Sequence, residues 1–384
     1  MNKYRFLSSF LILTLSCVSC TGTKSTLTDS PIIFSEIHVG NDLYDWAIEI
    51  ANISDNNIDI SDYRIAIYMG NSDETINISL PSYLLRTNET YVLSHSEADS
   101  SILNLADLTS SQLTFDGTWP IALYHGKSIA DVMGIIGYQY DFAVDLDLVR
   151  KSDFLLGRRE YNAYDWIRYS GSYLDNLGTI ENDFTPEEFL QGPHLTSEDF
   201  ALPLTEDGIV GSGGAVNVSI TYYGDGDTTT VSLPNSATSS GFIASRESVR
   251  YLAINCPEIQ HGDYIDAEPW GYAAKDYNNE LLSSATAFAV STSKNYTIRD
   301  VYGRLLGYIW VAFNENPQPE DYFNMSYLMV KEGYASLRFL GGDQTNDQMY
   351  YRDVTYTNFI RNAEILATDL GLKIHGEIDP DFDY

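Results

Sequence analysis

Cysteine and basic side chains are scarce in this chain. Three cysteines occur among 384 residues, and two of them, Cys17 and Cys20, lie within the first twenty, so Cys256 is the single thiol of the remainder. The chain has 22 Lys and Arg residues against 54 Asp and Glu residues, a formal net charge of −32. An acidic surface of this kind repels nucleic acid unless local arginines or a metal ion reverse the field. The six histidines lack the spacing of zinc ligands, so a zinc site is not expected.

No apolar run at the N-terminus is long enough to span a bilayer, which takes about 20 apolar residues. The run from Phe6 to Leu15 is shorter, follows two basic residues, and precedes the small residues Val18 and Ser19 before Cys20. This order of basic, apolar and small residues has the features of an export signal, and it resembles a bacterial lipoprotein signal.

The lipoprotein resemblance implies a signal peptide over residues 1–20, with Cys20 as the lipidated first residue of the mature chain. Residues 21–30 would then be a tether, and the protein would lie at the extracellular face of the bacterial cell membrane. With Cys256 as the only remaining thiol, no intrachain disulfide can form. Cys17 is the alternative lipidation site, and a plain cleaved signal of a secreted protein is the other interpretation.

Alternating apolar residues dominate from residue 31 to about residue 178. The 44% hydrophobic content and the 29 tyrosines favour strands over long helices. The clearest alternation, in YRIAIYMG, sets Tyr63, Ile65, Ile67 and Met69 against Arg64, Ala66 and Tyr68. Several short strands at this spacing predict an all-β sandwich over residues 31–178.

The character of the chain changes after a connector, predicted over residues 179–213. The connector has three prolines and a Gly-Ser-Gly-Gly cluster without clean periodicity. Beyond it, strand-like runs alternate with helical segments, one after Pro269 and one ending before Gly371. Residues 214–384 are therefore predicted to form an α+β domain.

Three short motifs in the second domain carry charged side chains. The first is Asp225-Gly226-Asp227, which is also typical of an ordinary hairpin turn. The second sets Arg250 eight residues before Glu258, and a surface ion at each end of a strand is the simpler explanation. The third is Asp300-Val301-Tyr302-Gly303-Arg304, which could be no more than a turn entering a strand.

Taken together, the three motifs favour phosphodiester hydrolysis. Negative charge gathers on the phosphate oxygens in the transition state, and planar guanidiniums can bind these oxygens in pairs. Acidic oxygens suit a hard divalent cation, and a glutamate can take a proton from water.

The segments VNVSITYYGDGDTTTV, VRYLAINCPE, PWGYAAKDYNNELL, RDVYGRLLGYIWV, NMSYLMVKEGYA and AEILATDLGLKI resemble, in order and spacing, those of the staphylococcal nuclease (thermonuclease) family. The resemblance lies within residues 205–384 and covers essentially all of residues 214–377. It implies an OB-fold barrel of five strands with three helices. It also implies a Ca²⁺-dependent endonuclease that cuts DNA and RNA and leaves 3′-phosphate products.

The resemblance also implies roles for individual residues. Arg250 and Arg304 would bind the phosphate, and Glu258 would act as the general base or orient the attacking water. One Ca²⁺ ion would be held by Asp227, Asn255 and the backbone carbonyl of Cys256, with Asp225 in support. Tyr302 and Phe339 would contact the substrate.

Three positions depart from the family pattern in a way that bears on these roles. Asn255 stands where an aspartate is usual and Cys256 where a threonine is usual, so a weaker metal site is expected. Gly341 stands where a second aromatic is usual, which reduces stacking on the substrate. Cys256 itself is not expected to be a nucleophile, because no histidine is placed to activate it.

The first domain resembles a lamin-tail domain in FSEIHVG, WAIEIANISDNNIDISDYRIAIY and GTWPIALYHGKSIADVMGIIGY. This resemblance implies an immunoglobulin-like sandwich that binds an unidentified ligand or acts as a spacer. The sequence thus predicts a multidomain, monomeric, surface-anchored nuclease that degrades extracellular nucleic acid. The alternative is a nucleic-acid-binding or adhesion lipoprotein whose nuclease fold has lost efficient chemistry.

Overall fold

The computed structural model describes residues 26–70, 74–180, 190–238, 242–260, 266–338 and 349–382. The predicted signal, both cysteines that were candidates for lipidation, and Phe339 lie outside the described residues. Within the described ranges, no helix has the length and apolar character needed to cross a membrane.

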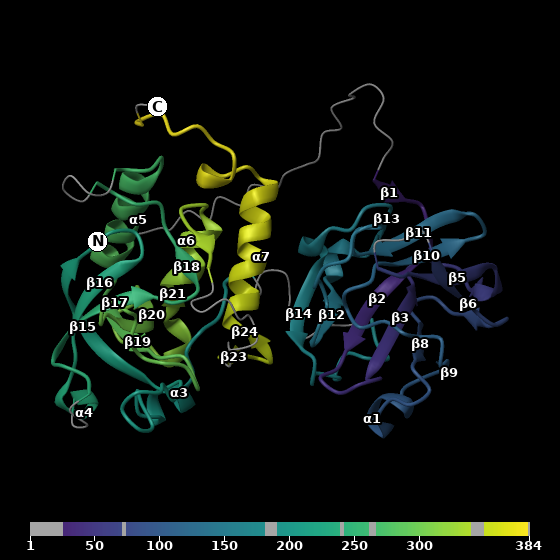
Figure 1. Cartoon of the computed structure of the whole chain (residues 1–384), viewed down its shortest axis with the longest axis horizontal. Helices are drawn as coiled ribbons and strands as arrows, with labels where there is room; N and C mark the ends of the chain where they lie inside the picture. The colour runs from purple at the N-terminus through teal and green to yellow at the C-terminus, as the bar shows by residue number, and fades with distance from the viewer. Residues whose placement is uncertain are drawn as a thin grey trace.

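The first region, residues 26–180, is built from short strands and very short helices (Figure 1). The strands are β1 (Leu27–Thr28), β2 (Ile32–Val39), β3 (Trp46–Asn52), β4 (Ile58–Asp59), β5 (Tyr63–Tyr68), β6 (Thr75–Ser79), β7 (Leu84–Leu85), β8 (Thr90–Ser94), β9 (Leu108–Thr109), β10 (Ile121–His125), β11 (Ser128–Met133), β12 (Leu146–Arg150), β13 (Gly157–Arg158) and β14 (Trp166–Ser170). The helices are α1 (Ser100–Leu103) and the 3-10 turns η1 (Ile60–Asp62), η2 (Ser152–Phe154) and η3 (Ala163–Asp165).

Two sheets of the first region share one hydrophobic core. The larger sheet has the order β14-β12-β2-β3-β8-β9, and the smaller has the order β11-β10-β5-β6. Ile48 and Ile50 from the larger sheet and Ile65 and Ile67 from the smaller belong to the same buried cluster. The alternation in YRIAIYMG therefore identifies the face of β5 that is turned to this core.

The opposite face of β5 is buried as well, which the alternation did not predict. Ala66 and Tyr68 form a second, smaller cluster with Ala122 of β10 and Val132 of β11. The hydroxyls of Tyr68 and Tyr124 lie 2.6 Å apart in a hydrogen bond. Both faces of β5 are thus buried, although its alternating pattern is typical of a strand with one face exposed to solvent.

The second region contains the remaining elements. In chain order these are α3 (Ser197–Ala201), β15 (Ala215–Tyr223), β16 (Thr228–Ser232), α4 (Asn235–Thr238), β17 (Arg246–Tyr251), β18 (Ile254–Asn255), α5 (Gly271–Ser284), β19 (Ala287–Ser291), β20 (Leu305–Ala312), η4 (Pro319–Asp321), β21 (Phe323–Asn324), α6 (Met325–Lys331), β22 (Ser336–Leu337), β23 (Tyr350–Tyr351), β24 (Val354–Thr355), α7 (Tyr356–Asp369) and η6 (Lys373–His375).

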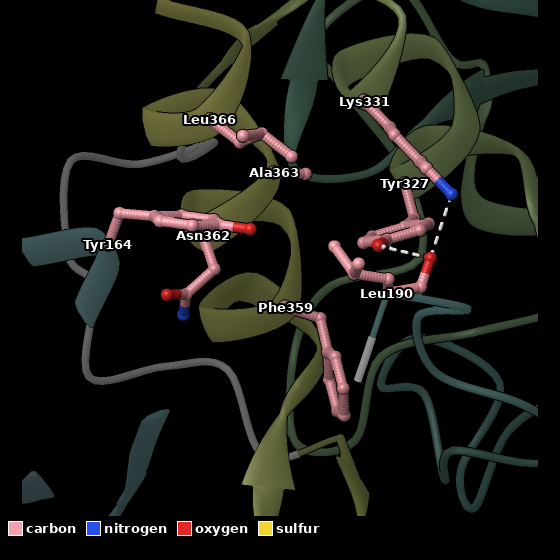
Figure 2. A pocket seen from close by; sticks show the side chains of 8 residues that line it. All are labelled: Tyr164, Leu190, Tyr327, Lys331, Phe359, Asn362, Ala363 and Leu366. Atoms are coloured by element: carbon pink, nitrogen blue, oxygen red, sulfur yellow. Dashed lines mark hydrogen bonds between the residues drawn. The ribbon is translucent and has the colours of Figure 1, made fainter. Parts of the chain in front are cut away.

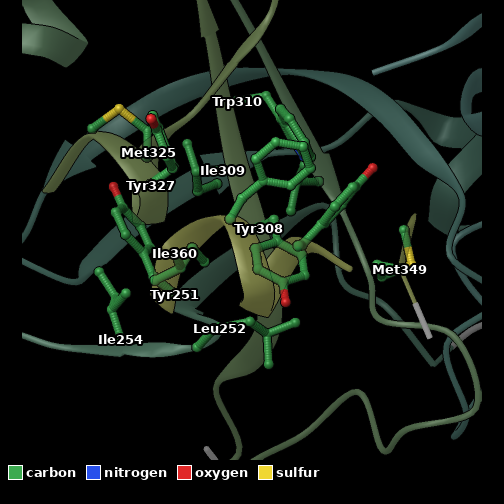
Figure 3. Packing of buried hydrophobic residues seen from close by; sticks show 14 of the residues in the cluster. Tyr251, Leu252, Ile254, Tyr308, Ile309, Trp310, Met325, Tyr327, Met349 and Ile360 are labelled. Carbon is green, nitrogen blue, oxygen red and sulfur yellow. The ribbon is translucent and has the colours of Figure 1, made fainter. Parts of the chain in front are cut away.

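Five of these strands close into a barrel, as an OB-type fold requires. The sheet order is β17-β16-β15-β19-β20, and an additional parallel pairing of β17 with β20 joins its two ends. Tyr251, Ile309 and Trp310 fill the core of this region together with Met325 and Ile360 from the helices (Figure 3). The β-rich fold with α5, α6 and α7 is consistent with the predicted OB-fold.

Both predicted helices of the second region are present. The first begins at Gly271, two residues later than Pro269 suggested, because Trp270 takes a left-handed conformation with φ 67° and ends the preceding loop. The last, α7, ends with Gly371 at φ 62°. The amides of Gly371 and Leu372 donate to the carbonyls of Thr368 and Ala367 at 3.0 and 2.9 Å, which is the pattern of a Schellman cap.

Residues 190–213 were predicted to lie in the connector, yet they pack on the barrel. Leu195 and Leu204 are buried in the barrel's hydrophobic cluster. The short helix α3 begins with a capping box, in which Thr196 and Asp199 satisfy each other's backbone amides. This segment is thus part of the barrel's packing. The domain boundaries given above otherwise stay predictions.

The two regions meet along α7, which lies between the barrel and β14 (Figure 1). Val149, Ile167, Tyr169 and Tyr173 of the first region belong to the same buried cluster as the barrel core. The joint therefore shares hydrophobic packing and is not a flexible link.

A small pocket lies at this joint, between η3, α6 and α7 (Figure 2). The hydroxyl of Tyr327 and the ammonium of Lys331 both donate to the carbonyl of Leu190, at 3.0 and 2.8 Å. None of the residues that line the pocket is a predicted site residue.

Candidate active site

The turn between β15 and β16 carries the first two carboxylates. Gly226 lies so close to the next loop that an added Cβ would be 2.7 Å from Cβ of Cys256 and 2.8 Å from its Sγ. Only glycine allows this approach without a shift of the neighbouring chain. The turn therefore places Asp225 and Asp227 directly against the segment that follows β17.

Arg250 joins this turn to the end of β17. Its guanidinium forms an ion pair with Asp227 Oδ2 and donates to the Asp227 carbonyl at 3.3 Å. Its other terminal nitrogen donates to Asn255 Oδ1 at 3.0 Å. Both Arg250 and Asp227 are buried to the same degree, each with an exposed fraction of 7%.

Asn255 and Cys256 lie beside this ion pair. The amide of Cys256 donates to Asp227 Oδ2 at 2.8 Å, and Asn255 Nδ2 donates to the Cys256 carbonyl at 3.2 Å. Asn255 Oδ1 accepts a second guanidinium bond, from Arg338 at 2.9 Å. The predicted residues Asp227, Arg250, Asn255 and Cys256 thus form one hydrogen-bonded group.

Arg304, the residue before β20, reaches the same end of the barrel. Its Nε donates to Asp300 Oδ2 at 2.6 Å, and its terminal nitrogen lies 3.4 Å from Oγ1 of Thr228, the residue after Asp227. The parallel pairing of β17 with β20 sets Arg250 opposite Leu306, two residues beyond Arg304. The barrel closure is therefore what brings the two predicted phosphate-binding arginines to one edge.

Tyr302 lies in the turn before Arg304, where Asp300 Oδ1 accepts from the amides of Tyr302 and Arg304 at 2.9 and 2.8 Å. Its ring is 82% exposed, and the guanidinium carbon of Arg304 lies 5.5 Å from the ring centre. An exposed aromatic next to a cationic side chain suits stacking on a nucleobase.

The backbone of Glu258 is fixed by two hydrogen bonds to Glu268. Its amide donates to Glu268 Oε2 at 2.9 Å, and its carbonyl accepts from the amide of Glu268 at 2.9 Å. Gly271, the first residue of α5, passes so close that an added Cβ would be 2.2 Å from the Glu258 carbonyl oxygen. The negative charge of Glu258 contributes to the raised pKa values of Asp227 and Cys256, which indicates that its carboxylate lies near both.

Burial dominates the electrostatics of the group. It raises the pKa of the Asp227 carboxyl from 3.8 to about 6; Arg250 opposes this shift and Asp225 adds to it. Burial also raises the pKa of the Cys256 thiol well above its ordinary value, and nearby Asp227 adds to the shift. A thiol that stays protonated is a poor nucleophile. Cys256 therefore serves through its backbone and its packing.

The expected calcium ligands are close together, but most of their oxygens already accept hydrogen bonds. Asn255 Oδ1 accepts from two guanidiniums, and the Cys256 carbonyl accepts from the Asn255 amide. Asp227 Oδ2 is taken by Arg250 and by the Cys256 amide. In the part of the chain that the structure describes, no three or more His, Cys, Asp or Glu side chains are placed to hold a metal ion. As these residues lie, the set of four expected ligands does not fit a Ca²⁺ ion, which takes six to eight oxygens.

Arg338 and Thr228 were not predicted as members of the site. Arg338 reaches it because β18 pairs with β22, which sets Asn255 opposite Ser336. A pairing of two-residue strands across about eighty residues leaves no periodic signal in the sequence. Thr228 directly follows the first motif, but its contact with Arg304 depends on the barrel closure.

One comparison with known proteins found a match that overlaps the site. A family profile described as staphylococcal nuclease homologue matches residues 248–356. The chain thus contains a staphylococcal-nuclease-like segment, which suggests a nuclease-type function in general and a nucleic-acid substrate. The matched segment includes Arg250, Glu258 and Arg304 but not the turn with Asp225 and Asp227. The search of curated proteins found no match to this chain.

Proposed function

We propose that this protein is a surface-anchored endonuclease that hydrolyses phosphodiester bonds of extracellular DNA and RNA. The observation that supports the proposal is that barrel closure brings Arg250 and Arg304 to one edge, while the charge of Glu258 acts on Asp227, the partner of Arg250. Two guanidiniums and one carboxylate are the groups that a phosphodiester transition state needs from a protein.

In the proposed reaction Arg250 and Arg304 hold two phosphate oxygens and balance the charge that grows on them. Glu258 takes a proton from water as the water oxygen attacks phosphorus. The bond to the 5′ oxygen breaks and this oxygen takes a proton from solvent water, which leaves a 3′-phosphate and a free 5′ hydroxyl. Tyr302 and Phe339 contact the substrate. Calcium dependence stays a prediction from the family resemblance, and no step here is routed through the ion.

The role of the first region and the anchoring belong to the same proposal. The pair of sheets over residues 31–178 supports an immunoglobulin-like, lamin-tail module that binds a ligand or sets a distance. Lipidation at Cys20, or at Cys17, would hold a monomer at the outer face of the membrane. Mass spectrometry of the mature N-terminus would distinguish these two cysteines from a plain cleaved signal.

The decisive experiment incubates the chain without residues 1–20 with denatured DNA and with RNA, in Ca²⁺, in Mn²⁺ and in chelator. We expect cleavage that ends in 3′-phosphates and that falls at least 100-fold in Glu258→Gln, because the general base is lost. Glu280→Gln, on the exposed side of α5, is the matched control and should cut normally. No cleavage under any condition, with retained binding in a gel shift, would favour the nucleic-acid-binding or adhesion alternative.

A further inference from the structure

Asn255 holds two guanidiniums with one neutral oxygen. Its Oδ1 accepts from Arg250 at 3.0 Å and from Arg338 at 2.9 Å. An amide oxygen has two lone pairs, so these two donors use its full accepting capacity. We propose that Arg250 and Arg338, held together by Asn255, form with Arg304 a three-arginine phosphate site that binds nucleic acid without calcium.

The proposal rests on the proposed function and concerns how that site binds its substrate. Arg250 is ion-paired with Asp227, and Arg304 with Asp300. Arg338, in contrast, donates to the neutral amide of Asn255 and is solvent-exposed. Its charge is therefore available for a phosphate oxygen, whereas an aspartate at position 255 would neutralise it.

The backbone fixes Arg338 at this place. Its amide donates to the Ala253 carbonyl at 2.9 Å, and Leu337 pairs with Ile254 in the short β18–β22 ladder. The Leu337 amide also donates to Glu364 of α7 at 2.8 Å. The backbone that carries Arg338 is thus held by a strand and a helix, and its guanidinium is directed to the site by the bond to Asn255.

The charge of the surrounding region shows why a third arginine matters. Residues 205–384 carry 11 basic and 25 acidic side chains, a net charge of −14. A polyanion approaching such a surface is repelled, and only local cations can offset this. Without a fitting metal site, the guanidiniums at this barrel edge are the cations that can.

The test measures binding apart from cleavage. The chain without residues 1–20 and with Glu258→Gln is titrated against a fluorescein-labelled oligothymidylate, by anisotropy, in chelator and in Ca²⁺. A gel confirms that the probe stays intact. We expect dissociation constants that differ less than about threefold between the two conditions. In Arg338→Ala the dissociation constant should rise about tenfold, and the salt dependence should lose about 0.7 of its logarithmic slope, the value for one contact with single-stranded phosphate.

Three variants make the result specific. Arg246→Ala removes a charge from the far end of β17 and should change binding less than twofold. Arg338→Lys should restore only part of the affinity, because a point charge cannot form the paired contact. Asn255→Asp should weaken binding in chelator and make it improve with Ca²⁺. Thermal melting shows whether each variant is folded.

Two outcomes would overturn the inference. One is an equal dissociation constant for Arg338→Ala and Arg246→Ala. The other is that binding by the Glu258→Gln protein without further substitutions disappears in chelator and returns with Ca²⁺. Both can occur in an active nuclease, so they leave the proposed function standing. Binding by three arginines without any cleavage by the protein that retains Glu258 would instead refute the nuclease and keep the phosphate site.

Discussion

The sandwich and the barrel both bury an aspartate–arginine pair, but they enclose it differently. In the sandwich, Arg150 lies 2.5 Å from Asp131, and both are at most 2% exposed. The remaining lone pairs of Asp131 accept from the amides of Phe34, Val132 and Arg158 at 3.0 Å each. Every side of that pair is closed by protein, so its role is structural.

The barrel pair of Asp227 and Arg250 has an open side. The Arg250 guanidinium donates to Asn255 Oδ1, and the same oxygen accepts from the exposed Arg338. A buried charge that connects to exposed cations can meet a ligand, whereas a buried charge closed on all sides cannot. The connection to the surface, and not the burial of the charge, separates the candidate site from the scaffold.

The largest effect is expected from breaking the enclosed Asp131–Arg150 pair of the sandwich. Asp131→Asn removes the nearer of the two buried carboxylates that face the Arg150 guanidinium and leaves Asp165 at 3.6 Å, which should lower the free energy of unfolding by about 3–5 kcal/mol. Urea denaturation followed by fluorescence measures this loss, and Asp42→Asn on the exposed surface is the control. The cleavage rate per folded molecule should not change. If the rate falls while the fold is intact, the comparison between the regions is wrong.

Removing Arg250 from the Asp227–Arg250 pair of the barrel should lower the cleavage rate instead. Arg250→Ala takes away a phosphate contact and should reduce the rate about 100- to 1000-fold, or about 2.7–4 kcal/mol. Initial rates on denatured DNA, with melting curves to confirm folding, provide the measurement. Arg250→Lys keeps the charge without the paired geometry and should recover a small part of the rate. A rate for Arg250→Ala close to that of the unaltered protein would remove the guanidinium from the mechanism.

The buried carboxyls of the sandwich predict how stability depends on pH. Burial raises the pKa of Glu49 from 4.5 to about 8, although Ser35 and the Gly178 amide donate to its oxygens at 2.5 and 2.7 Å. The folded state therefore keeps a proton that the unfolded state releases, and stability should fall as the pH rises from about 4.5 to about 8. The expected loss is on the order of 1–3 kcal/mol, measured as melting temperatures at pH 5, 6, 7 and 8. Glu49→Gln should flatten the curve, and a melting temperature that rises over this range would contradict the assignment.

The smallest effect is expected at Cys256. Cys256→Ala keeps the backbone amide that binds Asp227, so the cleavage rate should change less than about threefold and the stability by about 1 kcal/mol. Alkylation with iodoacetamide, mapped by mass spectrometry, should leave Cys256 unmodified until the protein is unfolded. Rapid labelling of the native protein at this position would show that the thiol is not held protonated as described.

Local patterns in the sequence marked only the charged motifs with Asp227, Arg250 and Arg304. The family resemblance added Asn255 and Cys256, and the structure brings Asp227, Arg250, Asn255 and Cys256 into one hydrogen-bonded group. No local pattern in the sequence indicates the barrel closure or the β18–β22 pairing. As a result the contact of Arg304 with Thr228, and the whole contribution of Arg338, were not predictable.

The sequence was also a weaker guide to which faces are covered. The alternation in β5 marked one apolar face and gave no sign that Ala66 and Tyr68, on the other face, are buried with residues of β10 and β11. The residues around 200 have the composition of a linker, yet Leu195 and Leu204 pack into the barrel. Short apolar residues without periodicity carry little information about partners that are distant in the sequence.

The joint formed by α7 has a consequence for the order of events during synthesis. Tyr356 at the start of α7 packs edge-on against Tyr308 and Trp310, with ring centres 5.4 Å apart in both cases, and the helix also contacts β14. Chains emerge from the ribosome with the N-terminus first, so the sandwich and most of the barrel are made before this helix. Until it emerges, the surfaces that it will cover on both regions have no partner within the chain. The two regions can therefore complete their packing against each other only after α7 has been synthesised.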